Sequence, residues 1–287
     1  MSALPVTVIG GYLGAGKTTL VNHLLRHAEG RRLAVLVNEF GALPIDADLI
    51  EAQGDDLIAI AGGCVCCSFG SDLTAALMQM CALDPAPDHV LIESSGVAIP
   101  GAIMATAALL DGIRCDGIVV LADGGSVRRA FDDPYIGDTI ARQLAQADIV
   151  LLNKADLAAP DLADWLASKA PGAAVVPCER GRVPVEAVLG LGPQLVPQGH
   201  FHHADALFDS LVITPQGDPA TLARTLAEGG FGVVRAKGWM QGAQGMALIH
   251  TVGRQFSAEP AGADARAGVV CIGLKGQLDV EALRRLT

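Results

Sequence analysis

Short apolar runs alternate with longer segments of mixed apolar and polar residues along the first two thirds of the chain. The apolar runs that predict buried strands are residues 6–9, 33–37, 57–61, 90–92, 117–122, 149–152 and 174–177. The segments that predict helices are residues 18–27, 71–83 and 138–147. Such alternation is typical of an α/β domain, in which helices cover both faces of a mostly parallel, doubly wound sheet.

A second pattern begins after residues 190–199, which are rich in glycine and proline and predict a linker. An apolar run at 207–213 comes next, followed by a helix capped near Asp218, three strand-like runs and a last helix. This order of elements predicts a smaller α+β domain. The domain boundaries that we expect are 1–191 for the first domain, 192–204 for the linker and 205–287 for the second domain.

A glycine-rich segment joins the first predicted strand to the first predicted helix. Residues 11–18 read G-Y-L-G-A-G-K-T, which matches the phosphate-binding pattern G-x-x-x-x-G-K-[ST] of P-loop NTPases. Glycines let backbone N–H groups surround phosphate oxygens at a helix N-terminus, whose partial positive charge favours anions. Lys17 is expected to reach the β- and γ-phosphates, and the Thr18 hydroxyl to bind Mg²⁺. The residues predicted to bind nucleotide here are Gly11, Gly14, Ala15, Gly16, Lys17, Thr18 and Thr19.

The base of the nucleotide is predicted from a second motif, N-K-A-D at residues 153–156, which follows an apolar run. The carboxylate of Asp156 can accept two hydrogen bonds, and guanine offers two donors side by side where adenine does not. Lys154 can lie along the plane of the base, while Asn153 can connect this loop to the phosphate loop. The motif therefore favours GTP over ATP. Glu179 and Arg180 follow a predicted strand and are further candidates for a loop beside the base.

Three cysteines lie close together just after the apolar run at 57–61. Cys64, Cys66 and Cys67 follow two glycines, which favour a loop. Three thiolates on one short loop can converge on a soft or borderline cation such as Zn²⁺. A transiently occupied metal site is our main interpretation. Structural zinc, which would need a fourth ligand, a redox pair and simple packing of apolar thiols are the alternatives.

Five motifs occur in a fixed order, and together they resemble the CobW family of metal-handling P-loop GTPases, relatives of the urease and hydrogenase maturation GTPases. The similarity covers essentially the whole chain, because residues 235–238 and 248–254 resemble the C-terminal domain of that family. The resemblance implies GTP hydrolysis coupled to delivery of a transition metal to a client protein or cofactor pathway. The five motifs are residues 11–19, N-E-F-G at 38–41, G-G-C-V-C-C at 62–67, E-S-S-G at 93–96 and N-K-A-D at 153–156.

The same resemblance implies roles for residues near the γ-phosphate. Glu93 matches the acidic residue of the E-x-x-G segment and is expected to contact Mg²⁺, directly or through water. Gly96 would offer its N–H to the γ-phosphate. Asn38, Glu39 and Asp46 match a switch-like segment, in which Glu39 is the candidate for positioning the attacking water. The predicted catalytic residues are therefore Lys17, Glu39 and Glu93, and the predicted metal ligands are Cys64, Cys66, Cys67, Thr18 and Glu93.

The chain departs from the family at two places. Ala42 follows the N-E-F-G motif and Ile99 precedes Pro100, where family members often have acidic residues. A carboxylate ligand from either place is therefore in doubt in this chain. His200, His202 and His203 lie where many members carry a long histidine-rich stretch, but three histidines in a polar linker need no metal-binding role.

Composition favours an intracellular protein. The net charge of −11 and the lack of a basic run argue against binding to nucleic acid or to an anionic membrane. No apolar stretch approaches the roughly 20 residues that span a bilayer, and no secretory signal is expected. The seven cysteines are odd in number and partly clustered, so they do not suggest a disulfide framework. We therefore expect a cytoplasmic location.

Several functions remain compatible with the sequence. The main expectation is a GTP-hydrolysing metallochaperone that carries zinc, or in second place cobalt, to a client metalloprotein or cofactor-synthesis enzyme. A nucleotide-gated metal buffer without a client has the same motifs. A small-molecule kinase on a P-loop scaffold is disfavoured by the N-K-A-D motif. A nucleotide-dependent homodimer is possible, because a partner is one way to accelerate slow hydrolysis.

Overall fold

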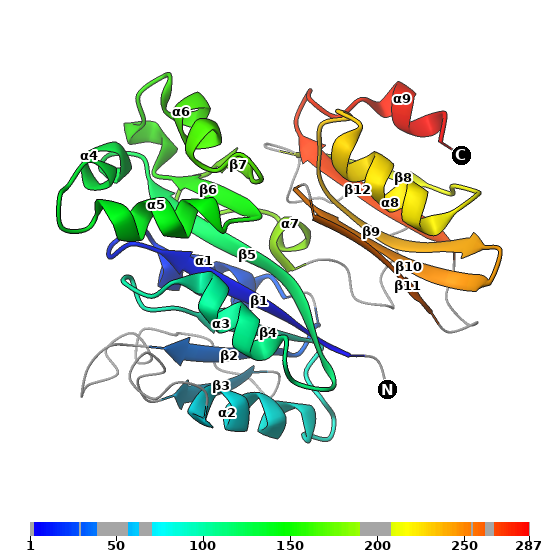
Figure 1. Cartoon of the computed structure of the whole chain (residues 1–287), viewed down its shortest axis with the longest axis horizontal. Helices are drawn as coiled ribbons and strands as arrows, with labels where there is room; N and C mark the ends of the chain where they lie inside the picture. Colours follow the sequence, from blue (N-terminus) through cyan, green and yellow to red (C-terminus); the bar gives the residue numbers. More distant parts are fainter. Residues whose placement is uncertain are drawn as a thin grey trace. The chain divides into compact units, whose positions relative to one another are not determined.

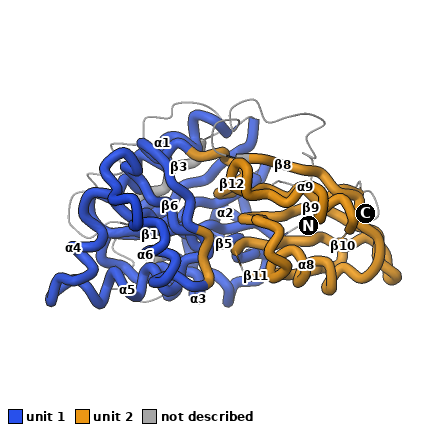
Figure 2. Tube along the Cα trace, turned by 90° about the horizontal axis from the view of Figure 1, so that it is seen from above, with its two compact units in different colours: residues 1–171, 175–182 blue, residues 172–174, 183–287 orange. Residues whose placement is uncertain are grey.

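The computed structural model describes residues 3–28, 30–38, 57–62, 71–189, 208–253, 255–261 and 267–286. The chain forms two compact units, residues 1–171 with 175–182, and residues 172–174 with 183–287 (Figure 2). Each unit is considered by itself below. The expected linker at 192–204 lies outside the described residues, and the domain boundaries expected from the sequence stay a prediction.

A seven-stranded sheet forms the centre of the first unit, with the spatial order β3-β2-β4-β1-β5-β6-β7 (Figure 1). The ladders among strands β1 to β6 are all parallel. Each predicted apolar run falls within one of these strands, so the α/β class is confirmed. The strands are β1 (Leu4–Gly11), β2 (Leu33–Asn38), β3 (Leu57–Gly62), β4 (His89–Glu93), β5 (Ile113–Asp123), β6 (Ile149–Asn153) and β7 (Ala174–Pro177).

Helices connect these strands across both faces of the sheet. Helix α1 leads from β1 to β2, whereas α3 leads from β4 to β5 in the opposite direction across the strand order. Because such crossovers are right-handed, α1 and α3 cover opposite faces. Figure 1 shows α3 and α5 in front of the strands. The helices of this unit are α1 (Lys17–Arg26), α2 (Ser71–Cys81), α3 (Pro100–Ala107), α4 (Val127–Phe131), α5 (Gly137–Ala145) and α6 (Leu162–Lys169).

The carboxyl ends of the parallel strands lie at one edge of this sheet. Every residue of β4 and of β6 is buried, and both strands end in a polar residue, Glu93 and Asn153. Strand β1 ends at Gly11 and β5 ends at Asp123. Ligands of open parallel sheets bind outside the carboxyl ends of the strands. This edge is therefore where the fold places the predicted nucleotide site.

The second unit contains a five-stranded sheet in the order β11-β10-β9-β12-β8, whose ladders are antiparallel. Helix α8 begins after Asp218, whose side chain accepts a hydrogen bond of 2.7 Å from Thr221 N, as expected for a cap. The elements of this unit are α7 (Val185–Leu189), β8 (Phe208–Ile213), α8 (Pro219–Glu228), β9 (Val233–Gly242), β10 (Gly245–Val252), β11 (Gln255–Pro260), β12 (Gly268–Leu274) and α9 (Val280–Arg284).

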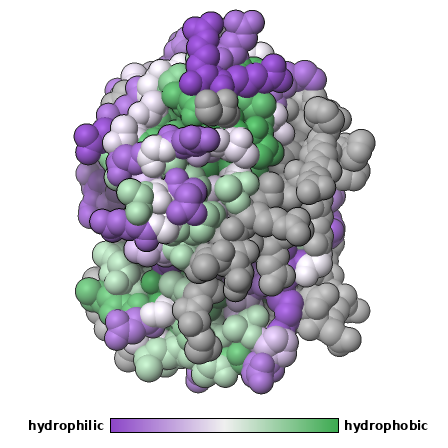
Figure 3. Space-filling model, turned by 90° about the vertical axis from the view of Figure 1, so that its right-hand side faces the viewer, coloured by the Kyte–Doolittle hydropathy of each residue, from purple (hydrophilic) through white to green (hydrophobic). Residues whose placement is uncertain are grey.

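Four strands follow α8, where the sequence predicted three. Of these four, β11 lies at the edge of the sheet, and its side chains are exposed or half-buried. An edge strand without a buried face lacks a regular apolar pattern, so it is the hardest of the four to predict from sequence. Figure 3 shows hydrophobic and hydrophilic residues interspersed over the described part of one face of the molecule. None of the helices in the described part of the chain has the length and apolar character that crossing a membrane requires.

Candidate nucleotide site

The glycine-rich loop between β1 and α1 has the backbone of a phosphate cradle. Gly16, directly before α1, has a φ of 101°, in a region that side-chain-bearing residues rarely adopt. Helix α1 has no acidic residue in its first turn, so no carboxylate of the helix itself offsets the partial positive charge of its N-terminus. Lys17 is 8% exposed, and its Nζ donates to Gly11 O at 3.1 Å. The ammonium group therefore lies against the loop that is predicted to surround the phosphates.

The two residues predicted to bind Mg²⁺, Thr18 and Glu93, lie in contact with each other. Thr18, on the first turn of α1, donates a hydrogen bond of 2.8 Å from Oγ1 to Oε1 of Glu93. Glu93 ends β4, the strand that pairs with β1, and its side chain is buried. A hydroxyl and a buried carboxylate in contact are hard oxygen donors of the type that Mg²⁺ prefers. The donor set therefore fits a magnesium ion.

Gly96 lies directly beside the phosphate loop. A Cβ atom at Gly96 would come within 2.8 Å of the backbone nitrogen of Leu13. Gly96 therefore packs against the phosphate loop, and its predicted contact with a γ-phosphate stays a prediction. Of the other predicted phosphate-loop residues, Thr19 is exposed on the first turn of α1, whereas Ala15 is buried.

The N-K-A-D segment is joined to the phosphate loop, as expected from the sequence. Asn153 Nδ2 donates to Ala15 O at 2.9 Å, and its Oδ1 accepts from Gly181 N at 3.0 Å. A Cβ atom on Gly16 would overlap the amide of Asn153, so glycine is required there for steric reasons as well. The side chain of Asn153 thus fixes the phosphate loop against both the segment after β6 and the segment after β7.

Of the remaining residues of the motif, Lys154 and Ala155 are half-buried and Asp156 is exposed. Lys154 has a left-handed backbone conformation with φ of 54°, and its Nζ contacts Gly14 O at 3.2 Å and Asp123 Oδ2 at 2.5 Å. Asp156 is exposed in the 3₁₀ turn η2 (Ala155–Leu157). An exposed carboxylate beside a restrained lysine is accessible to a base. Arg180, the candidate beside the base, also has a left-handed backbone with φ of 52°.

Sequence reasoning missed two residues of this site. Asp123 ends β5 and pairs with Lys154, and Gln143 is a buried side chain of α5 that contacts the loop after β4. Asp123 could have been found, because it follows an apolar run as Glu93 and Asn153 do. Gln143 lies within an amphipathic helix and gives no such signal.

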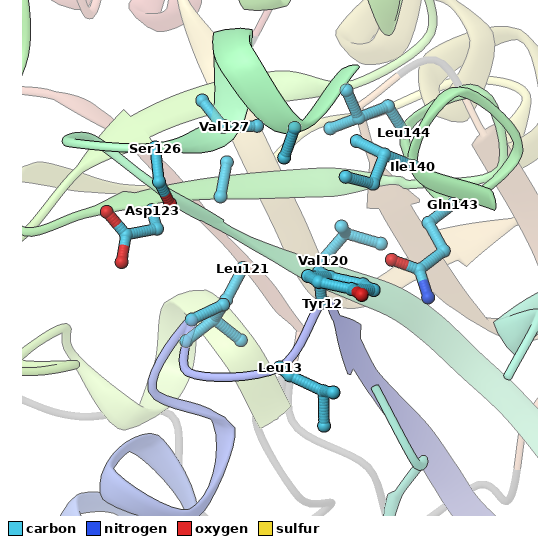
Figure 4. A pocket seen from close by; sticks show the side chains of 13 residues that line it. Tyr12, Leu13, Val120, Leu121, Asp123, Ser126, Val127, Ile140, Gln143 and Leu144 are labelled. Carbon is cyan, nitrogen blue, oxygen red and sulfur yellow. The ribbon is translucent and has the colours of Figure 1, made fainter. Parts of the chain in front are cut away.

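A small cavity of about 20 Å³ lies behind the phosphate loop (Figure 4). Tyr12 and Leu13 line it from the loop, Val120 to Asp123 from β5, and Gln143 from α5. This volume has room for about one water molecule and not for a nucleotide. The cavity is therefore too small to be the nucleotide site by itself.

Several predicted residues lie outside the described part of the chain. They are Glu39, Asp46, Cys64, Cys66, Cys67, His200, His202 and His203. Within the described ranges, no group of three or more histidine, cysteine or acidic side chains is placed to hold a metal ion. The predicted ligand set for the transition metal is therefore still a prediction.

The described cysteines behave as packing residues. Cys178 and Cys271 are buried, and burial raises the pKa of each thiol to about 12. Burial also raises the pKa of Cys81 and Cys115, which are half-buried. A metal ligand or nucleophile needs the thiolate form, which a raised pKa disfavours. These four thiols are poor candidates for metal ligands.

Two family models match this chain, and one of them includes the motifs described above. Residues 5–175 match the family model described as CobW/HypB/UreG, nucleotide-binding domain. Residues 208–286 match the model described as cobalamin synthesis protein cobW C-terminal domain.

Three similar proteins are named for zinc. The chain is 32% identical over 224 residues to the zinc chaperone CobW of a Sinorhizobium species, which covers 66% of this chain and 63% of that protein. It is 36% identical over 167 residues to the zinc chaperone YjiA of Escherichia coli, and the match covers 55% of this chain and 51% of that protein. It is 33% identical over 167 residues to the zinc-regulated GTPase metalloprotein activator 1 of Schizosaccharomyces pombe, and the match covers 55% of this chain and 40% of that protein.

The matched part of the chain thus spans less than two thirds of each relative's own length. The nucleotide-binding model, in contrast, covers more than half of this chain and includes both the phosphate loop and the N-K-A-D motif. The chain therefore belongs to the CobW/HypB/UreG family.

Proposed function

We propose that this protein binds and hydrolyses GTP with Mg²⁺ and uses the nucleotide cycle to hold and release a zinc ion for a client protein. The observation that carries the proposal is the hydrogen bond from Asn153 Nδ2 to Ala15 O. It joins the motif that selects the base to the loop that binds the phosphates. Because the two motifs are held together, one nucleotide can contact both of them, with its base at the N-K-A-D motif and its phosphates at the phosphate loop.

Guanine is supported by the chemistry of Asp156. Its exposed carboxylate can accept from the N1–H and the exocyclic amine of guanine, whereas adenine offers no such pair of donors. Lys154 is held at Asp123 and Gly14, so its alkyl chain is available to lie along the plane of the base. These contacts favour GTP over ATP and disfavour the small-molecule kinase.

Hydrolysis is supported by the groups around the γ-phosphate position. The Lys17 ammonium would oppose the charge that develops on the phosphoryl oxygens, and the Gly96 N–H would donate to one of them. Thr18 and Glu93 would hold Mg²⁺, which supplies charge neutralisation between the β- and γ-phosphates when bound. We keep Glu39 as the proposed water-positioning residue. The switch-like segments contain no arginine that could act as an arginine finger, so we expect slow turnover without a partner.

Zinc as the cargo is supported by sequence position and by the named relatives. Cys64, Cys66 and Cys67 come directly after β3, which ends at Gly62 with its carboxyl end at the same edge of the sheet as Gly11 and Glu93. Three thiolates suit zinc, with cobalt as the second candidate. The similar proteins named above carry zinc in their names, which favours zinc over cobalt for this chain.

Delivery to a client, in preference to storage, is supported by the relative named as a metalloprotein activator. We infer the client to be a metalloprotein or a cofactor-synthesis enzyme in the reducing cytoplasm. A nucleotide-dependent homodimer would be one way to accelerate hydrolysis. A buffer without a client would bind zinc equally well but would transfer none to a separate apoprotein during GTP turnover.

Calorimetric titration of the protein with GTP and with ATP, each with Mg²⁺, tests the nucleotide assignment. We expect GTP to bind at least about tenfold more tightly, since each lost or mismatched hydrogen bond to a charged group costs about 1.5–3 kcal/mol. Asp156→Ala should remove this preference, whereas the exposed Asp164→Ala on α6 should not. Equal affinity for GTP and ATP in the unsubstituted protein would overturn the guanine assignment.

A further inference from the structure

The loop that follows β4 is in contact with the phosphate loop on one side. Gly96, whose N–H we expect at the γ-phosphate, lies so close to the backbone nitrogen of Leu13 that a Cβ atom would be 2.8 Å from it. Contact on one side limits how near the loop can come but does not prevent it from moving away. A second contact is needed to keep Gly96 in place.

Gln143 on α5 supplies that second contact. Its side chain is 1% exposed, and Nε2 donates to Gly96 O at 3.1 Å and to Ala98 O at 2.8 Å. A primary amide has two N–H donors, and here both are used by carbonyl groups of the same loop. Removing them would leave the buried carbonyl oxygen of Gly96 and the half-buried one of Ala98 without these partners. A buried acceptor left without a hydrogen bond costs more free energy than an exposed one.

The same side chain also lies next to the phosphate loop. Gln143, Tyr12 and Leu13 line the small cavity behind that loop, and Figure 4 shows the amide of Gln143 directed toward this space. Gln143 is therefore adjacent to both segments that surround the γ-phosphate position. Of these three side chains, only that of Gln143 is buried, whereas Tyr12 is half-buried and Leu13 is exposed.

We propose that Gln143 is a positioning residue that holds Gly96 against the phosphate loop and thereby sets the preference of the site for GTP over GDP. This inference rests on the function proposed above. Only GTP has a γ-phosphate to accept from the Gly96 N–H, whereas the β-phosphate is bound by residues 14–18. Loosening the loop after β4 therefore weakens GTP binding and leaves GDP binding nearly unchanged.

A neighbouring glutamine, Gln146, caps the C-terminus of the same helix and provides a matched control. Gln146 Oε1 accepts from Gly101 N at 2.9 Å, at the start of α3 and beyond the Gly96 loop. Gln143→Met and Gln146→Met each remove one glutamine amide, within α5 and at its C-cap respectively, at similar side-chain volume. They differ in which backbone segment loses its hydrogen bond.

The test measures dissociation constants for fluorescent GTPγS and fluorescent GDP, with Mg²⁺, for the unsubstituted protein and the two variants. For Gln143→Met we expect GTPγS affinity to fall by about tenfold and GDP affinity to stay within about twofold, within the usual range of coupling between sites. Gln146→Met should leave the ratio of the two constants unchanged. A Gln143→Met protein that binds both nucleotides with an unchanged ratio would overturn the inference while leaving the proposed function intact, even if its melting temperature fell.

A second measurement does not depend on a variant that folds. Hydrogen exchange of the unsubstituted protein should show slower exchange of the amides between Gly96 and Gly101 with GTPγS than with GDP. In the GTPγS state both Gln143 and the γ-phosphate would hold this segment, whereas in the GDP state only Gln143 would. Equal exchange in this segment would contradict the inference. If the unsubstituted protein bound neither nucleotide, the proposed function itself would fail, and the positioning role would fail with it.

Discussion

The hydroxyl of Thr18 donates a hydrogen bond of 2.8 Å to Oε1 of Glu93, although 75 positions separate the two residues in the chain. The contact exists because β1 and β4 are parallel neighbours, which brings the start of α1 beside the end of β4. One residue offers a hydroxyl and the other a buried carboxylate. Both are expected ligands of the same Mg²⁺.

Replacing the carboxylate of Glu93 should therefore raise the Mg²⁺ concentration that nucleotide binding requires. We expect Glu93→Gln to raise the Mg²⁺ concentration at which GTPγS binding is half-maximal by about tenfold, because an amide keeps the shape but loses the charge. Titration of bound fluorescent GTPγS with Mg²⁺ measures this shift. Thr18→Ser keeps the hydroxyl and should behave like the unsubstituted protein. An unchanged Mg²⁺ dependence of Glu93→Gln would remove this carboxylate from the magnesium site.

The bond between Asn153 and Ala15 predicts a loss of stability as well as of binding. Asn153→Ala leaves a buried carbonyl at Ala15 and a backbone N–H at Gly181 without their present partner. We expect the free energy of unfolding of the first unit to fall by about 2 kcal/mol, measured in urea. Asp156→Ala, at an exposed position of the same motif, should weaken GTP binding without this loss. Equal stability of the two variants would argue against the structural role of Asn153.

Lys17 should matter more for hydrolysis than for folding. Its ammonium contacts the carbonyl of Gly11, and in a bound nucleotide it would face the phosphates. We expect Lys17→Ala to reduce the single-turnover rate of GTP hydrolysis by at least about 100-fold, as loss of a preorganised charge does at other active sites. Phosphate release from radiolabelled GTP measures the rate. Lys275→Ala, at an exposed site of the second unit, is the control and should not change it. A Lys17→Ala rate close to normal would contradict the assignment.

The buried thiol of Cys271 predicts a pH dependence of stability. Its pKa is raised to about 12 in the folded protein, whereas in the unfolded chain it lies near 9. Because the unfolded state loses its proton first, the stabilising effect is complete below about pH 9 and is lost as the pH rises toward 12. The slope is about 1.4 kcal/mol per pH unit for one thiol. Urea unfolding between pH 8 and about pH 10.5 should show a shallower decline for Cys271→Ala than for the unsubstituted protein. Parallel curves would show that this thiol ionises alike in both states.

Much of the fold could be predicted because its signals are local. The apolar runs of β1 to β7 are buried strands, and the predicted helices begin and end within two residues of α1, α2 and α5. The phosphate loop and the N-K-A-D motif could be placed because each is a short segment between a strand and a helix. The sequence predicted three strands after α8 where there are four, and β11 has the weakest signal of them because its side chains are not buried.

The residues that sequence reasoning missed depend on contacts between distant segments. Gln143 acts on a loop 45 or more positions earlier in the chain, and its place in an amphipathic helix does not distinguish it from a surface glutamine. The pairing of Asp123 with Lys154 follows from the parallel register of β5 and β6, in which Asp123 lies opposite Asn153. Such partners become visible only when the order of the strands is known.

The coupling of the nucleotide to the metal is the centre of the proposed function, and one measurement tests it most directly. The dissociation constant for Zn²⁺ can be determined by competition with a chromophoric chelator, once with Mg²⁺ and GTPγS and once with GDP. We predict tighter binding with GTPγS, by about fivefold or more, and loss of the tight site in Cys66→Ser without loss of GTPγS binding. The same zinc dissociation constant in both nucleotide states would contradict the account.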